Sequence, residues 1–109
     1  MISLDYYMPN ESGNAIRVSV CGIVFYFSYS IVVAYYTHAT GLVASHNVWS
    51  RTTGKHLNFI CSDHSDRTDY DTFAKGLVEV ERRMATALKQ MNNLELMKRL
   101  EEAANEKEK

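Results

Sequence analysis

Residues 18–50 contain no aspartate, glutamate, lysine or arginine, and this uncharged stretch constrains the fold more than any other feature of the chain. Its centre, "VSVCGIVFYFSYSIVVAYY", is long enough to cross a bilayer. However, Gly22, Ser28 and Ser30 interrupt it, and it is rich in valine, isoleucine, tyrosine and phenylalanine, which favour strands. It also lacks a leucine block and a flank of several basic residues, since Arg17 stands alone beside it. We therefore expect buried strands and no membrane span.

Short turn-forming pairs divide the first half of the chain into strands. The run "AIRVSV" alternates apolar and polar residues, as in a strand with one wet face. The runs "IVFYFS", "IVVAYYT" and "LVASHNVW" follow, separated by "CG", "YS" and "HATG". Such tight connections predict an antiparallel sheet of four to six short strands within residues 1–60.

The second half of the chain is highly charged and reads as helix. Residues 61–109 carry nine Lys/Arg and eleven Asp/Glu, against three and two in residues 1–60. Thr68 and Asp71 have the spacing of a capping box. An apolar stripe with 3-4 spacing follows, formed by Phe73, Leu77, Val80, Met84, Leu88 and Met91.

The pair Asn92 and Asn93 predicts a break or a kink before a second helix whose charged last turn frays. The predicted fold class is α+β, with an N-terminal antiparallel β-sheet followed by two C-terminal helices over residues 68–109. One domain accounts for all 109 residues. The apolar stripe left over after the sheet is covered favours a homo-oligomer.

The bulk composition excludes several classes of protein. The net charge of −1 argues against a protein coated in basic charge for nucleic-acid binding. Cys21 and Cys61 lie far apart without a CxxC motif, so we expect buried free thiols in a reducing cytosol. The four histidines match no zinc-binding spacing, so no metal site is predicted. Ser, His and Asp are present without a nucleophile elbow or another catalytic arrangement, so we do not expect an enzyme.

The stretch "NVWSRTTGKHLNFI" concentrates the polar chemistry of the first half. Ser50 is a good N-cap for a short helix in which Leu57 and Ile60 pack inward. Backbone N–H groups at the helix start, hydroxyls and cations suit a phosphate, although the stretch is not a P-loop. The alternative interpretation, a capped polar turn with solvated cations, stays open. The candidate ligand-binding residues here are Trp49, Arg51, Thr52, Thr53, Lys55, His56 and Asn58.

Two further groups of residues have a functional and a structural interpretation. Arg82 and Arg83, flanked by Glu79 and Glu81, are either a salt-bridged surface or contacts to a ligand phosphate. The aromatic residues of the strands form either the core of the sheet or, on an exposed face, stacking platforms for a base. These aromatic residues are Phe25, Tyr26, Phe27, Tyr29, Tyr35 and Tyr36.

The combination "FSYSIVVAYYT…GLVASHNVWSRTTGKHLNFI" resembles a family of small phage-encoded proteins with a "WS-TT-KHLN" signature, among which we place the first type of Thoeris anti-defence protein. The likeness covers residues 15–90, and Trp49–Asn58 is its specific part. Elsewhere the match is one of layout, an antiparallel sheet followed by two helices.

The resemblance implies a function in the cytoplasm of an infected bacterium. Such proteins act as homodimers or larger assemblies that bind a cyclic ADP-ribose signal, in some cases cyclic oligonucleotides, and hold it without cleavage. They need no cofactor. Arg82 and Arg83 are candidates from their chemistry alone. The competing interpretations are a single-stranded nucleic-acid-binding module, which the weak net charge disfavours, and an inhibitor that binds a host protein.

Overall fold

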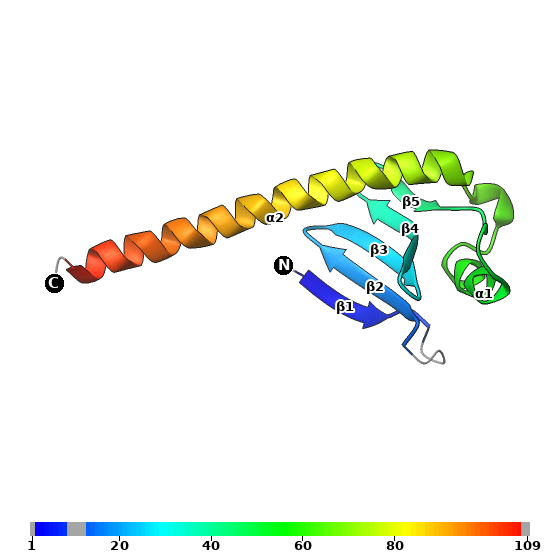
Figure 1. Ribbon diagram of the computed structural model, residues 1–109, viewed down its shortest axis with the longest axis horizontal. Helices are drawn as coiled ribbons and strands as arrows, with labels where there is room; N and C mark the ends of the chain where they lie inside the picture. Colours follow the sequence, from blue (N-terminus) through cyan, green and yellow to red (C-terminus); the bar gives the residue numbers. More distant parts are fainter. Residues whose placement is uncertain (1, 9–12, 108–109) are drawn as a thin grey trace.

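A computed structural model describes residues 2–8 and 13–107 and shows a five-stranded antiparallel sheet followed by two α-helices (Figure 1). Each strand pairs with its neighbour in the chain, in the order β1-β2-β3-β4-β5. The predicted α+β class is therefore confirmed. The elements are β1 Ile2–Tyr6, β2 Ala15–Val20, β3 Ile23–Ser28, β4 Ile31–Thr37, β5 Gly41–Ala44, α1 Arg51–Ile60, the 3-10 turn His64–Asp66 and α2 Tyr70–Lys107.

The strands are joined by the tight turns that the sequence predicts. Cys21 and Gly22 connect β2 to β3 with φ angles of 51° and 82°, a two-residue turn whose twist matches that of the strands. Tyr29 begins the next turn at a φ of 58°, and its amide donates to the Asn14 carbonyl at 2.8 Å. The prediction that both thiols are buried is wrong. Cys21 is exposed at a turn and Cys61 is half-buried, and both are free.

The first half of α2 covers one face of the sheet. Phe25 and Tyr35, on adjacent strands, form a buried cluster with Phe73 and Val80 of the helix. The rings of Tyr35 and Phe73 stack with centroids 5.5 Å apart. Burial there raises the pKa of Tyr35 above its usual value. The predicted stripe is thus confirmed where it crosses the sheet, since Leu77 and Met84 pack against the same cluster.

Gly76 is the point of closest approach between α2 and the sheet. A Cβ atom built there would lie 2.3 Å from the Tyr35 hydroxyl oxygen and 3.4 Å from its Cζ. Any larger residue would therefore force either the helix or the Tyr35 ring to move. The absence of a side chain explains why a glycine stands within a helix, where it costs about 1 kcal/mol relative to alanine.

α1 packs against the face of the sheet opposite α2. Successive residues of a strand point to alternate faces, so one strand can contribute side chains to the contacts with both helices. Val33, Ala34 and Ala44 form a second buried cluster with Leu57 of α1. A bulge in β4 makes this possible: Tyr26 pairs with Ala34 and Phe27 with Val32, so that Val33 is the extra residue. Two consecutive residues of β4 thereby reach the same helix.

Two predicted features of α2 are wrong. Asp69 caps the helix rather than the Thr68–Asp71 pair, accepting from the Thr72 amide at 3.0 Å. Thr68 is committed elsewhere, since its backbone bonds to Ala44 and His46. The break at Asn92 and Asn93 is absent, and α2 continues to Lys107 as one helix of 38 residues. The predicted fraying of the last turn falls partly on residues 108–109, which lie outside the described residues.

The length of α2 makes the chain elongated. A helix of this size is about 57 Å long, and the extents of the chain are 63 × 30 × 19 Å. The radius of gyration is 18.1 Å, whereas a compact domain of this length has about 13 Å. Figure 1 shows the C-terminal half of α2 running past the sheet. Within the described residues, no helix combines the length and apolar character needed to cross a membrane.

The contact at Gly76 gives a stability prediction. We expect Gly76→Ala to lower the free energy of unfolding by about 1–3 kcal/mol, the usual cost of overpacking a filled core. Urea denaturation followed by circular dichroism measures it. Most of the loss should disappear when Gly76→Ala is made in a Tyr35→Phe background, because the clashing hydroxyl is gone. An equal loss in both backgrounds would contradict this explanation.

Candidate functional site

Ser28, at the end of β3, fixes α1 to the sheet. Its Oγ lies 2.6 Å from His56 Nδ1 and 2.9 Å from Thr53 Oγ1, and all three residues are buried. The Ser50 hydroxyl caps α1 by accepting from the Thr53 amide at 3.2 Å, as predicted. His56 also lies between the rings of Tyr7 and Tyr29, with centroid distances of 6.4 and 5.9 Å. Thr53 and His56 therefore lie inside the protein, where they position the helix.

Trp49 and Asn58 brace the two ends of α1. Trp49 is half-buried, packs against the Leu57 cluster and meets the Tyr70 ring edge-on at 5.7 Å. Asn58 accepts from Arg67 Nη2 at 2.7 Å, and Arg67 also donates to the Cys61 carbonyl at 2.9 Å. Arg67 is buried and ties the connection between the helices to α1. This role of Arg67 was not predicted from the sequence, because Arg67 stands in a polar loop.

The remaining members of the predicted site face solvent. Arg51 and Lys55 are exposed on α1 and Thr52 is half-buried. Asn47 stands against the same helix, because an added Cβ on Gly54 would come within 2.9 Å of its Nδ2. A ligand on the surface of this segment would thus meet Arg51, Thr52 and Lys55, while Thr53 and His56 lie beneath them.

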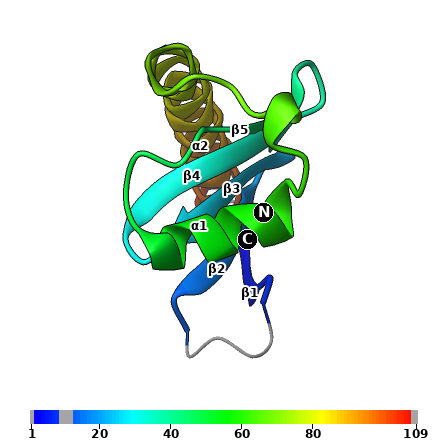
Figure 2. The ribbon, with the colours of Figure 1, turned by 90° about the vertical axis from the view of Figure 1, so that its right-hand side faces the viewer.

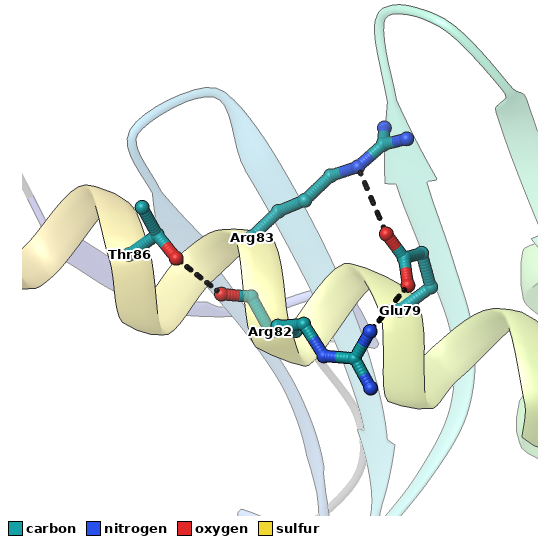
Figure 3. A network of polar contacts seen from close by, with 4 residues as sticks. All are labelled: Glu79, Arg82, Arg83 and Thr86. Carbon is teal, nitrogen blue, oxygen red and sulfur yellow. Dashed lines mark hydrogen bonds and ion pairs between the residues drawn. The ribbon is translucent and has the colours of Figure 1, made fainter.

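Arg82 and Arg83 lie apart from α1. Both pair with Glu79 on α2, at 3.2 Å from Arg82 Nη1 and 3.8 Å from Arg83 Nε, and Thr86 bonds back to the Arg82 carbonyl (Figure 3). Twelve residues of helix separate Arg82 from Tyr70, about 18 Å of axial rise. Of the two interpretations of Arg82 and Arg83, the structure therefore supports the salt-bridged surface.

α1 covers one end of its face of the sheet and crosses in front of the strands in Figure 2. The other end of this face is open. A hollow of about 510 Å³ lies there on β1 to β4. A smaller hollow of about 260 Å³ adjoins it towards α1 and shares Arg17 and Tyr26. We call the two together the open-face groove. Its larger part is lined by Ser3, Asp5, Arg17, Ser19, Val24, Tyr26 and Tyr36, and its smaller part adds Tyr6, Tyr7, Phe59 and Ile60.

The strand register explains how these side chains meet. Asp5, Arg17 and Tyr26 are directly opposite one another on β1, β2 and β3, and Val24 and Tyr36 form the next row. The groove was not predicted from the sequence, although the alternation in "AIRVSV" assigns Arg17 to the wet face of its strand. Period-two alternation assigns a residue to a face, but it does not reveal which residues of other strands stand opposite.

Among the residues that the structure describes, Arg17 is the only arginine or lysine that lines the open-face groove. Its Nε donates to Asp5 Oδ1 at 3.0 Å, and its Nη2 pairs with the other carboxylate oxygen. These bonds lower the pKa of Asp5, and hydrogen bonds to Asp5 and to the Tyr26 side chain raise the pKa of Arg17. Both groups are therefore charged at neutral pH, and the groove contains a fixed ion pair beside aromatic rings.

The groove contains groups that could bind a planar, anionic ligand. Tyr36 is partly exposed and Tyr26 half-buried, so their rings can stack on a planar group. An arginine beside them can hold a phosphate or carboxylate by two parallel hydrogen bonds. Beyond Phe59, a third hollow of about 400 Å³ brings Lys55 and Asn58 to the same side of the molecule. Among the described residues, no group of three or more His, Cys, Asp or Glu side chains is placed to hold a metal ion.

The predicted Trp49–Asn58 motif contains both buried and exposed residues, and this difference gives a stability test. Ser28→Ala should lower the free energy of unfolding by about 1–3 kcal/mol, because it takes a buried partner from Thr53 and His56. Arg51→Ala and Lys55→Ala, on the exposed side of α1, should change it by less than about 0.5 kcal/mol. Thermal and urea unfolding of the three variants measure this difference. A small effect of Ser28→Ala would mean that the buried bonds do not fix α1.

Comparison with known proteins gives one match. The sequence model of a family described as a family of unknown function (DUF8033) matches residues 3–75. No curated protein and no solved structure matches the chain. The matched residues run from β1 through α1 into the start of α2, so they include all the named residues of the open-face groove and all of α1. The chain belongs to this family of unknown function, DUF8033.

Proposed function

We propose that the protein binds a small cyclic nucleotide in the open-face groove and sequesters it without cleaving it. The proposed ligand class is a cyclic ADP-ribose isomer or a cyclic oligonucleotide, and the proposed role is to block Thoeris-type immunity from within an infected bacterium. The observation that carries the proposal is the placement of Arg17 directly opposite Tyr26, with Tyr36 in the next row, on an uncovered sheet face. The resemblance of the Trp49–Asn58 segment to phage anti-defence proteins supports the ligand class.

The size and chemistry of the groove support a nucleotide. A volume of about 510 Å³ lies within the range of small-molecule sites. A purine needs a flat ring to stack on, and a pyrophosphate needs a cation with directed donors. The serine hydroxyls of Ser3 and Ser19 add donors and acceptors for a ribose at the same end of the groove.

The "WSRTTGKHLN" segment has an indirect role in this proposal. Thr53 and His56 place α1, and α1 carries Phe59 to the end of the groove. Arg51, Thr52 and Lys55 add positive charge and a hydroxyl on the outer side of the same helix. In this scheme the motif builds one wall of the site, and only its exposed members approach the ligand.

Single-stranded nucleic-acid binding is the second candidate, since exposed tyrosines on a sheet can stack successive bases. Salt separates the two functions. Strand binding depends on releasing counterions from many phosphates and should weaken steeply as salt rises, whereas capture of one small nucleotide should weaken modestly. The formal net charge of −1 favours the small ligand.

Titration calorimetry against cyclic ADP-ribose isomers and cyclic dinucleotides tests the proposal. We expect one of them to bind, and the ligand to be recovered intact after heat denaturation. Tyr36→Ala should weaken binding by roughly 5- to 150-fold, the equivalent of a stacking contact. Leu42→Ala is the control, because Leu42 pairs with Tyr36 across β4 and β5 and is similarly exposed. Absence of binding to every nucleotide, or cleavage of the ligand, would contradict the proposal.

The ion pair gives a separate prediction about affinity. Asp5→Asn should tighten the binding of an anionic ligand several-fold, because it removes the carboxylate that competes for Arg17. Asp71→Asn removes the same charge from α2, on the other side of the sheet, and should leave affinity unchanged. The same calorimetric titration compares the two variants. Equal affinities would mean that Arg17 does not contact the anion.

A further inference from the structure

The edge strand β1 exposes an apolar surface on the α2 side of the sheet. Ile2 and Leu4 are 61% and 60% exposed, although each pairs with an apolar residue of β2. Beside them, Val18 and Met84 line an apolar hollow of about 340 Å³ at the flank of α2. This solvent-exposed surface is therefore as apolar as the interior of a protein.

The C-terminal half of α2 exposes a second apolar surface. Leu94, Met97 and Leu100 are also 58% to 61% exposed, in the part of the helix that runs past the sheet (Figure 1). We call residues 91–103 the tail. An isolated helix of this length is marginal in water unless its apolar side is covered.

The tail cannot cover the surface of its own β1. α2 is uninterrupted from Tyr70 to Lys107, so it cannot turn back. Its apolar positions also change face. The stripe from Phe73 to Met91 keeps the helical period, but Leu94, Met97 and Leu100 follow at three-residue intervals. Three residues turn the helix by about 300°, so each step moves the apolar position about 60° around the helix from the one before it. The apolar side of the tail is thereby directed away from the side that faces the chain's own sheet.

We infer that the tail of a second copy covers β1, in a two-fold dimer in which each copy gives its tail and receives the other. Five apolar side chains from each copy would bring on the order of 1,000 Å² of apolar surface to the contact. This is close to the apolar content of a standard interface of about 1,600 Å². The tail also carries both charge signs, Lys98 and Arg99 beside Glu95, Glu101 and Glu102, so its net charge is only −1 and repulsion between two copies is weak. The inference does not depend on the proposed ligand.

The first experiment measures the oligomeric state of the full chain by analytical ultracentrifugation. We expect wild-type protein to be a dimer at micromolar concentration. The triple variant Leu94→Gln, Met97→Gln, Leu100→Gln should raise the dissociation constant at least 100-fold. The control variant Lys89→Gln, Asn92→Gln, Glu101→Gln changes three exposed polar residues of the same helix without changing the net charge, and should remain dimeric. A monomeric wild type would overturn the inference.

The second experiment tests which surface receives the tail. Leu4→Thr keeps a strand-forming residue on β1 and should also dissociate the dimer. In a background with Cys21→Ser and Cys61→Ser, a chain with Leu4→Cys mixed with a chain with Met97→Cys should form a crosslink between copies with a short bifunctional reagent. A dimer that survives Leu4→Thr, or crosslinks only between Met97→Cys chains, would show that the tails pair with each other and would overturn the reciprocal arrangement. Circular dichroism at low concentration checks that the variants stay folded, which is expected because neither surface belongs to a buried cluster.

Discussion

The buried hydrogen bonds from Ser28 to Thr53 and His56 determine where α1 lies, and the position of α1 determines which part of the sheet stays open. The bonds are short, inaccessible to water and formed at one end of β3. A helix of ten residues anchored there reaches across one end of the sheet face only. The other end, with Arg17 and Tyr26, is left uncovered, and this is the end that has the chemistry of a binding site.

The two faces of the sheet are therefore covered to different extents because α1 and α2 differ in length. α2 is long enough to cross one whole face, and Gly76 lets it lie close to Tyr35. Yet α2 crosses over β3 and β4 and leaves the apolar side of β1 in water. The open-face groove is lined with polar and aromatic side chains, as expected of a surface that meets solvent or a ligand. The uncovered side of β1 is apolar, as expected of a surface that meets another protein.

The elements of this fold could be predicted from the sequence because each depends on local chemistry. Strands, tight turns and the Ser50 cap follow from residues close in the chain. The break at Asn92 and Asn93 was wrong because two asparagines cost a helix at most about 1.4 kcal/mol in propensity, less than the loss of a turn of backbone hydrogen bonds. The Thr68 cap was wrong because a neighbouring acid, Asp69, was equally suitable. Local rules give no means of choosing between two adjacent capping residues.

The candidate site could be predicted only in part, because it depends on contacts between distant residues. The polar density of the Trp49–Asn58 segment was visible, but polar residues serve equally as ligand contacts and as buried anchors. Thr53 and His56 became anchors through Ser28, which is 25 and 28 residues away in the chain. Arg17 and Tyr26 form one row of the groove through strand register, a property that no single segment contains. Sequence patterns thus identified the helix that bounds the groove and missed the groove itself.

β1 connects the two surfaces proposed to bind partners. Alternate residues of this strand point to opposite sides: Ser3 and Asp5 line the open-face groove, and Ile2 and Leu4 lie on the side assigned to a second copy. An edge strand held by one neighbour has few contacts that fix it. A tail packed on its apolar side would hold Asp5 in place against Arg17. Dimer formation and ligand binding would then act on the same strand, and any free energy by which one stabilises β1 would also favour the other.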